Sequence, residues 1–206
     1  GHLYPRVTGP DGSEHDVIAW LWARTVKSPN PANPVEVPLV NSWWLGKKKG
    51  KEAWIRASVT GDTVQYEVRH DATGPRRDED GTVSRKGGVS IADGTPIDFG
   101  YIRSEGRAGR LGSHLIAIVG EGKRGRVYVS PTEAHAATAA VQRPTEVPEG
   151  EIPDNPRNFN TPNYGLTAFS DLFTNRQLVT LTTLSNLVSE AREKVLEDAR
   201  SSGMIS

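Results

Sequence analysis

The sequence contains no cysteine in its 206 residues, so the chain as it stands has no disulfide and no thiolate ligand for a metal. Nor does it carry an excess of charge, because 25 Lys and Arg balance 25 Asp and Glu. This balance excludes a globally basic nucleic-acid binder but permits a local basic patch. The longest apolar run, residues 17–23, is far shorter than the roughly 20 residues that cross a bilayer. Since no cationic and apolar leader opens the chain, we expect a soluble, cytoplasmic protein without a membrane partner.

The size and composition are those of an ordinary globular chain. At 22.4 kDa the chain forms one domain or two small ones, and it can bury a core without disulfides or metals. Hydrophobic residues make up 35 %, and the 21 glycines bring the apolar share near the usual range. The composition therefore does not indicate disorder.

The first half of the chain predicts a small antiparallel sheet. Residues 16–26 mix β-branched and aromatic side chains, which is typical of a buried strand. After a proline-rich turn at 28–34, strands are expected at 35–46, 52–59 and 63–70, the last two joined by a tight hairpin at Gly61-Asp62.

The middle of the chain gives weaker signals. Residues 71–88 are polar and glycine-rich, so we expect a surface loop that carries no fold information. The seven glycines from Gly100 to Gly125 exclude one long helix, and short strands and turns are expected from 89 to 129.

Two capping boxes predict helices further on. Ser130, followed by Pro131 and by Glu133 three residues later, predicts a short helix ending near Ala140. Thr174 and Gln177 begin a second helix of about 25 residues, with Gly203 just past its end. Its apolar residues recur at three- and four-residue steps: Leu178, Leu181, Leu184, Leu187, Val188, Ala191 and Val195.

Residues 143–163 contain five prolines and are the best linker candidate. The sequence therefore predicts an α+β chain in three parts: a β-rich part at 1–142, the linker at 143–163, and a helical segment at 164–206.

No catalytic constellation is evident. The glycines do not form a phosphate-binding loop between a strand and a helix, and the five histidines lie in no nucleophile or HExxH motif. Loops at 28–33 and 90–94 have the outline of two metal knuckles. Their Ser, Asn and Asp side chains are poor zinc ligands, so two capped turns explain them better. A small independent enzyme has little support.

Basic residues gather in two segments. Within 101–129 only Glu105 and Glu121 offset the six cations Arg103, Arg107, Arg110, Lys123, Arg124 and Arg126. A second cluster, Lys47, Lys48, Lys49 and Lys51, adjoins Trp43, Trp44 and Trp54. Cations beside aromatics suit phosphate contact with base stacking. The alternative is that the tryptophans belong to the core and the lysines to a solvated turn.

Several segments together resemble the large prokaryotic DNA methylases described as adenine-specific with a zinc-ribbon insert. They cover most of the chain, in the family's order. The matching segments are GHLYP (1–5), IAWLWARTVKSPNPA (18–32), SWWLGKKKGKEAW (42–54), YIRSEGRAGRLGSHLIAIV (101–119), GRVYVSPTEAH (125–135) and NPRNFNTPNYGLTAFSDLFTNRQLVTLTTLSNLV (155–188).

The resemblance implies a non-catalytic fragment of a DNA methyltransferase that uses S-adenosylmethionine (SAM) to methylate the adenine amino group. In the family these segments lie between the methyl-donor loop and a D/N-P-P-Y motif, and neither is present in this sequence. Thr161-Pro162-Asn163-Tyr164 lacks the leading acid or amide and the second proline. Since that motif holds the target amine, the fragment is not expected to be active alone or to bind SAM.

The family places cysteines at the positions of Ser28, Asn33, Ser90 and Asp93, where they complete two zinc knuckles. All four are replaced, so we expect this chain to bind no zinc. The loss is either natural or engineered, and both interpretations stay open.

Two functions follow from the resemblance. The first is DNA binding for the methylase, in restriction-modification or phage defence, through the six cations of 101–129 and more weakly through Lys47, Lys48 and Lys49. The second is a structural or assembly module that docks on the remainder of the methylase chain without touching DNA. The apolar stripe of the C-terminal helix favours such docking, because it needs cover.

Overall fold

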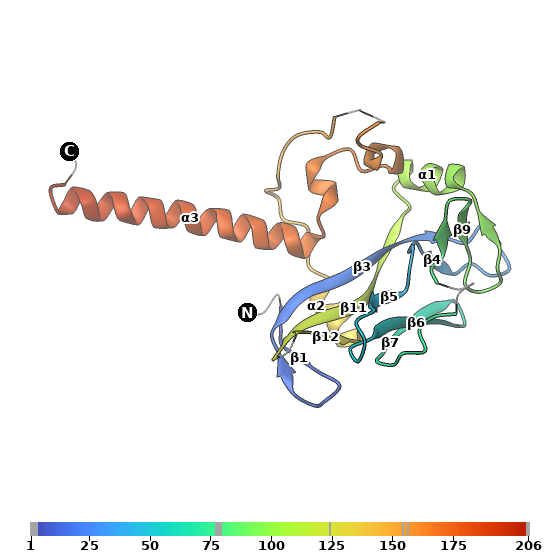
Figure 1. Cartoon of the computed structure of the whole chain (residues 1–206). Coiled ribbons are helices and arrows are strands. Elements are labelled where there is room, and N and C mark those ends of the chain that lie inside the picture. The colour runs from blue at the N-terminus through green and yellow to red at the C-terminus, as the bar shows by residue number, and fades with distance from the viewer. Residues whose placement is uncertain (1–3, 77–79, 124, 154, 156, 205–206) are drawn as a thin grey trace.

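The computed structural model describes residues 4–76, 80–123, 125–153, 155 and 157–204. It is an α+β fold of antiparallel sheets with a long C-terminal helix that runs out from the rest of the molecule (Figure 1). The predicted fold class is confirmed at this level. None of the helices in the described residues is long and apolar enough to cross a membrane.

The sheets consist of short strands, except for β3 and β11. The strands are β1 (Val7–Thr8), β2 (Glu14–His15), β3 (Val17–Lys27), β4 (Glu36–Pro38), β5 (Trp44–Gly46), β6 (Ala53–Thr60), β7 (Thr63–Arg69), β8 (Val83–Ser84), β9 (Gly87–Val89), β10 (Pro96–Ile97), β11 (Gly112–Gly122) and β12 (Gly125–Val129). The helices are α1 (Phe99–Arg107), α2 (Glu133–Ala139) and α3 (Asn175–Ser201), with 3-10 turns η1 (Thr161–Tyr164) and η2 (Phe169–Leu172).

A four-stranded sheet, in the order β12-β11-β3-β4, forms the centre of the fold. β3 and β11 pair antiparallel over most of their length, from Gly112 opposite Thr25 to Gly120 opposite Val17. The strand expected at 16–26 is therefore confirmed as β3.

A second sheet, β5-β6-β7, packs against the central one. Its inner side chains Trp43, Ile55 and Val68 meet Ile116 and Ala117 of β11 in one buried cluster. The hairpin β6–β7 has the expected two-residue turn, with Thr60 opposite Thr63 and Gly61 at φ +59°. This tight turn confirms the predicted hairpin.

The prediction of a single strand at 35–46 is wrong, because this segment forms two strands, β4 and β5, that belong to different sheets. Between them the chain leaves the central sheet at Val40, whose backbone N–H donates to the Thr82 hydroxyl over 3.0 Å. The Thr82 N–H in turn donates to the Val40 carbonyl over 2.8 Å. This local pairing redirects the chain.

Part of the expected featureless loop at 71–88 is also ordered by this contact. Thr82 is buried, and the residues after it form β8 and β9. β9 pairs with both β8 and β10 in a small third sheet. The prediction that 71–88 carries no fold information is therefore wrong at residues 82–88. A buried threonine hydroxyl gave no signal in the sequence pattern.

The prediction of short strands and turns at 89–129 is wrong in two places. Residues 99–107 form the helix α1, and residues 112–122 form the long strand β11. Asp98 caps α1, because its carboxylate accepts a hydrogen bond from the Tyr101 N–H over 2.9 Å. Gly106 is tolerated in this helix because it lies directly against the Tyr164 backbone of η1, where a side chain would clash. β11 then runs without a break from residue 112 to 122.

The cap of α2 also differs from the prediction, since Thr132 caps it rather than Ser130. The Thr132 side chain accepts from the His135 N–H, and His135 Nδ1 accepts from the Thr132 N–H over 3.2 Å. The Ser130 hydroxyl instead accepts from the Val68 N–H over 2.8 Å, so it joins the second sheet to this segment.

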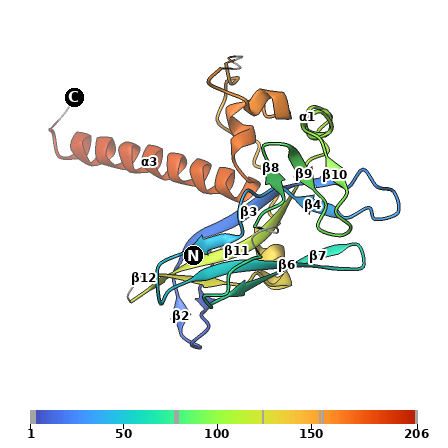
Figure 2. The same ribbon diagram turned by 45° about the vertical axis from the view of Figure 1, so that its right-hand side comes forward.

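The region between α2 and α3 is mostly irregular and packs at a few points. Ile152 is 8 % exposed, and its N–H donates to the Thr167 carbonyl over 2.7 Å. The Thr174–Gln177 capping box and Gly203 at φ +69° bound α3, as expected. The turned view in Figure 2 again shows α3 extending away from the sheets.

Candidate nucleic-acid interface

Exposed cations gather where two loops meet at one end of the central sheet. One loop is the β5–β6 turn, and the other is the β11–β12 turn. We call their described cations the hairpin patch. It consists of Lys47, Lys48, Lys49, Lys51, Lys123 and Arg126, all of them exposed. Arg124, predicted for the same group, lies outside the described residues.

Direct contacts hold the two loops side by side. The Tyr128 hydroxyl on β12 donates to the Leu45 carbonyl on β5 over 3.0 Å. Lys51 Nζ lies 3.6 Å from the position that a Cβ would take on Gly125. Gly46 likewise faces the Tyr128 ring. The lysine cluster at 47–51 and the β11–β12 turn, far apart in sequence, therefore form one surface.

The patch carries a net positive charge. Its nearest acids in sequence are Glu52, after the four lysines, and Glu121, directly opposite Arg126 in the β11–β12 ladder. These two carboxylates do not balance the six described cations. Because Lys and Arg side chains that contact phosphates release the cations condensed on a nucleic acid, such a surface suits phosphate groups.

The neighbouring tryptophans are structural. Trp43 is 5 % exposed in the core, and the Trp54 indole N–H donates to Asp71 Oδ1 over 3.1 Å. That hydrogen bond lowers the pKa of the Asp71 carboxyl. Trp44 lies between Gly74, which touches its ring, and Lys47, whose Nζ is 5.3 Å from the ring centre. These contacts favour the core interpretation of the tryptophans over base stacking.

The remaining predicted cations lie at the other end of β11, on and after α1 (Figure 1). β11, which is about 33 Å long at roughly 3.3 Å per residue, lies between these three arginines, Arg103, Arg107 and Arg110, and the hairpin patch. Arg110 forms a two-point ion pair with Glu105, at 2.9 and 2.6 Å. This pairing raises the pKa of Arg110 and lowers that of Glu105.

Arg103 is held differently, over two aromatic rings. Its guanidinium carbon lies 5.9 Å from the Phe99 ring centre and 5.8 Å from that of Tyr164. Arg107 ends α1 and is exposed. The five described cations of 101–129 therefore form two separate groups, and in the α1 group Arg110 is ion-paired while Arg103 lies over aromatic rings.

The two knuckle-like loops do come together. Asn30 and Asn33 both donate their side-chain amides to Asp93 Oδ2, over 2.7 and 3.0 Å. The other carboxylate oxygen accepts from the Thr95 N–H over 3.0 Å. Hydrogen bonds, first from Thr95 and then from the two asparagines, hold the pKa of Asp93 well below its usual range. A single carboxylate thus joins loops that are 60 residues apart.

These residues do not fit a zinc ion. The Ser28 and Ser90 hydroxyls accept from the N–H groups of Asn30 and Ala92, and Asp93 is already surrounded by donors. In the described part of the chain, no three His, Cys, Asp or Glu side chains are placed to hold a metal. Without thiolates the loops are closed by hydrogen bonds instead.

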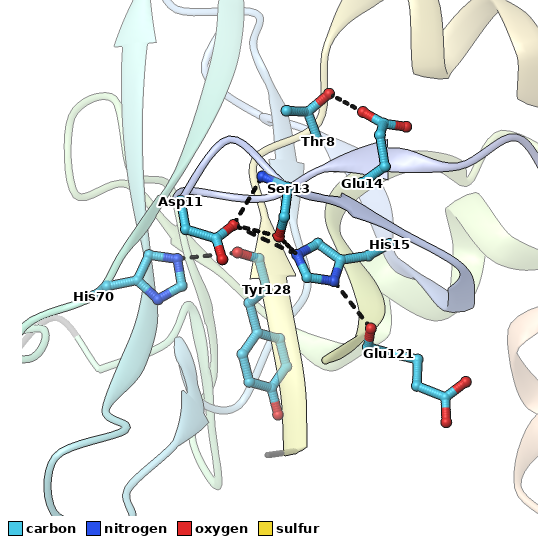
Figure 3. A network of polar contacts seen from close by, with 8 residues as sticks. All are labelled: Thr8, Asp11, Ser13, Glu14, His15, His70, Glu121 and Tyr128. Carbon is cyan, nitrogen blue, oxygen red and sulfur yellow. Dashed lines mark hydrogen bonds and ion pairs between the residues drawn. The ribbon is translucent and has the colours of Figure 1, made fainter. Parts of the chain in front are cut away.

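A polar network that the sequence reasoning missed adjoins the end of β11 (Figure 3). The Ser13 hydroxyl is 2.9 Å from His15 Nε2 and 2.6 Å from Asp11 Oδ1. The hydrogen bonds from Ser13 lower the pKa of Asp11. His15 Nδ1 lies 2.9 Å from the Glu121 carbonyl, at the end of β11. The network ties the β1–β2 hairpin to the base of the β11–β12 turn.

Serine, histidine and aspartate together resemble a hydrolase triad, but the local structure gives a simpler account. All three lie within one short hairpin, and the Ser13 N–H also donates to Asp11 Oδ1 over 3.0 Å, as in a tight turn. A hollow of about 980 Å³ lies elsewhere, lined by Trp22, Arg24 and Tyr164 among others. The Ser-x-His spacing was the only signal that could have revealed the contact.

A second histidine bridges three strands. The Tyr66 hydroxyl lies 2.8 Å from His114 Nδ1, and His114 Nε2 lies 3.3 Å from Glu36 Oε2. Burial raises the pKa of the Tyr66 hydroxyl, and the Glu36 carboxylate adds to the effect. This chain of contacts connects β7, β11 and β4, so it stabilises the packing of the two main sheets.

Comparison of the chain with protein-family models, with curated proteins and with solved structures finds no match.

Proposed function

We propose that the chain is a DNA-binding, non-catalytic part of a SAM-dependent DNA methyltransferase that acts on the adenine amino group. The hairpin patch is the observation that supports DNA binding. It brings Lys47–Lys49 and Lys51 beside Lys123 and Arg126, although the two loops are distant in sequence. Phosphate contacts of this kind supply affinity and orientation rather than sequence readout.

The methylase assignment rests on the resemblance of the sequence segments. The juxtaposed loops support it, because Ser28, Asn33, Ser90 and Asp93 stand where that family has two zinc knuckles, and Asn33 contacts Asp93 directly. We interpret residues 1–142 as a degenerate zinc-ribbon-like insert in which hydrogen bonds replace the metal. SAM and the catalytic motif then belong to the remainder of the methylase chain, which is the protein partner.

The patch can be tested with one charge reversal in each loop. We expect Lys48→Glu/Lys123→Glu to weaken binding to a labelled DNA duplex, measured by fluorescence anisotropy across a salt series. Because each phosphate contact contributes a slope of about 0.9 in log affinity against log salt, the slope should fall by about two. A matched control, Lys27→Glu/Lys86→Glu, makes the same charge change at exposed sites outside the patch. Equal losses in both variants would overturn the assignment.

The α1 group is a second proposed contact, separated from the first along β11. Arg107→Glu/Arg110→Glu tests it, because Arg110 must also give up its pairing with Glu105 to meet a phosphate. We expect a smaller change in affinity and salt slope than in the patch variant. If affinity and slope are both unchanged, the α1 arginines are not phosphate contacts.

A structural or assembly module that docks on the methylase core without touching DNA is the second candidate. It is favoured by the exposed apolar side chains of α3, which include Leu184 and Val188. Absence of any DNA binding at low salt would support this candidate and overturn the first.

A further inference from the structure

α3 presents an apolar stripe with the spacing of a coiled coil. Its members are Leu181, Leu184, Val188, Ala191 and Val195, at alternating steps of three and four residues. Leu184, Val188 and Val195 are 56 %, 70 % and 66 % exposed, and only Arg176 and Leu178 at the start of the helix are buried. The described residues therefore leave the stripe uncovered.

The composition of the helix shows that it needs cover. Residues 179–189 are rich in Thr, Ser, Val and Asn, which are weak helix formers. Several of these hydroxyls, such as Thr183 Oγ1 on the Val179 carbonyl at 2.7 Å, bond to the helix's own backbone. A helix of this kind is marginal in water and owes its stability to packing of its apolar face.

The stripe is complementary to itself when two copies run antiparallel. In that arrangement a and d positions of one helix face d and a positions of the other. A two-fold axis on the stripe side, at the height of residue 186 along the helix, places Leu181 opposite Ala191 of the second copy, and Leu184 opposite Val188 of the second copy. Each of these layers then pairs a leucine with the shorter alanine or valine, and the two-fold axis makes the interface isologous.

The charges favour the same orientation. Residues 178–189 contain no charged side chain, whereas all the charges of the helix beyond Arg176 lie in 190–200. Antiparallel pairing sets the charged half of one helix, with four acidic and three basic side chains, beside the uncharged half of the other, so that Asp198, three residues after Val195, does not face Asp198 of the second copy. Parallel pairing would bring the two charged halves together, and would crowd the two globular bodies at the same end of α3 (Figure 1).

We propose that α3 pairs with α3 of a second copy of this chain as an antiparallel two-helix coiled coil. The dimer presents two hairpin patches, one at each end of the assembly. The pairing does not depend on whether either patch binds DNA.

The first test is the mass of the chain in solution. Sedimentation equilibrium over about 1 to 100 µM should give twice 22.4 kDa at the upper end. Leu184→Lys should raise the dimer dissociation constant at least about tenfold, since it removes a buried leucine. Asn186→Lys, the matched control on the opposite face, should leave it within a factor of about two. A wild-type monomer throughout this range would overturn the proposal.

The second test measures the relative orientation of the two helices by disulfide formation. Any disulfide must join the introduced cysteines, because the chain has none of its own. Leu181→Cys and Ala191→Cys place one thiol each, about 15 Å apart along the helix. Antiparallel pairing predicts a mixed disulfide when the two variants are combined and none in either alone, because bridged Cα atoms lie within about 7 Å. Disulfides within each variant alone would show parallel pairing and overturn the proposal.

Discussion

The guanidinium carbon of Arg176 lies 3.7 Å from the centre of the Trp20 ring. The Tyr4 ring is close by as well, at 4.3 Å, so two aromatic rings hold one cation at the start of α3. Arg176 is 2 % exposed. Since Trp20 belongs to β3, this contact anchors the long helix to the central sheet.

Arg176→Lys should loosen this anchor. A lysine keeps the charge but lacks the flat guanidinium that covers an indole ring, so we expect the free energy of unfolding to fall by about 1–2 kcal/mol. Urea denaturation followed by tryptophan fluorescence measures it. Arg192→Lys, on the exposed part of α3, is the control and should change it by less than about 0.5 kcal/mol. Equal effects would mean that the rings contribute nothing specific to arginine.

Gly106 is a second point where the fold depends on one residue. A Cβ on Gly106 would clash with the Tyr164 backbone, and one on Gly165 would clash with Gly106 in return. Gly106→Ala must push η1 away from α1, which we expect to cost about 1–3 kcal/mol. Thermal unfolding monitored by circular dichroism should show a lower Tm. The exposed Ser104→Ala, on the same helix, serves as the control, and an unchanged Tm in Gly106→Ala would contradict the close packing.

The strongly patterned elements of this fold could be predicted from the sequence. β3, the β6–β7 hairpin and α3 each carry a local signal: mixed apolar residues, Gly61-Asp62, and the Thr174–Gln177 box. α1 could not be predicted in the same way. Its glycines indicated that no helix would form there. Gly106 is needed because its backbone lies against that of Tyr164, nearly 60 positions further on, and leaves no room for a side chain.

The candidate site shows the same limit. The lysines at 47–51, and Lys123 with Arg126, stood out as parts of two charge clusters, but their meeting depends on the Tyr128–Leu45 hydrogen bond between strands of two sheets. The outline of the two knuckle-like loops was visible in the sequence, but their meeting depends on the hydrogen bonds from Asn30 and Asn33 to Asp93. The Ser13–His15 contact was missed because two polar residues in a short hairpin give no periodic signal.

Asp93 should make stability depend on pH in the acid range. Its pKa is lowered in the folded protein from the ordinary value of 3.8, mainly by hydrogen bonds from Thr95. The stabilisation is therefore complete above pH 3.8 and is lost as the pH falls from there toward the lowered folded pKa. Asp93→Asn should be less stable than the wild type at neutral pH, and should lose less stability on acidification.

Urea denaturation at a series of pH values from about 7 to 2 tests this dependence. Asp62→Asn, in the exposed β6–β7 turn, is the control for removing a carboxylate. Parallel stability curves for the wild type and Asp93→Asn would show that the carboxylate does not stabilise the joined loops.

Restoring thiols to the two loops should create a zinc site. Asn33 and Asp93 lie in hydrogen-bond contact, and the Ser28 and Ser90 N–H groups close their loops on the Val35 and Thr95 carbonyls, both at 2.9 Å. Four thiolates at 28, 33, 90 and 93 would supply the tetrahedral set that zinc prefers. The variant Ser28→Cys/Asn33→Cys/Ser90→Cys/Asp93→Cys should therefore bind one zinc ion.

Cobalt titration gives the measurement, because tetrahedral thiolate coordination of Co²⁺ has a distinctive visible absorption. We expect the metal-free variant to be less stable than the wild type, since Asp93 loses its hydrogen bonds, and zinc to restore stability by mass action. The triple variant that keeps Ser28 is the matched control and should bind metal much more weakly. If the four-cysteine variant takes up no metal, the two loops lack the geometry of paired knuckles, and the degenerate zinc-ribbon interpretation fails with it.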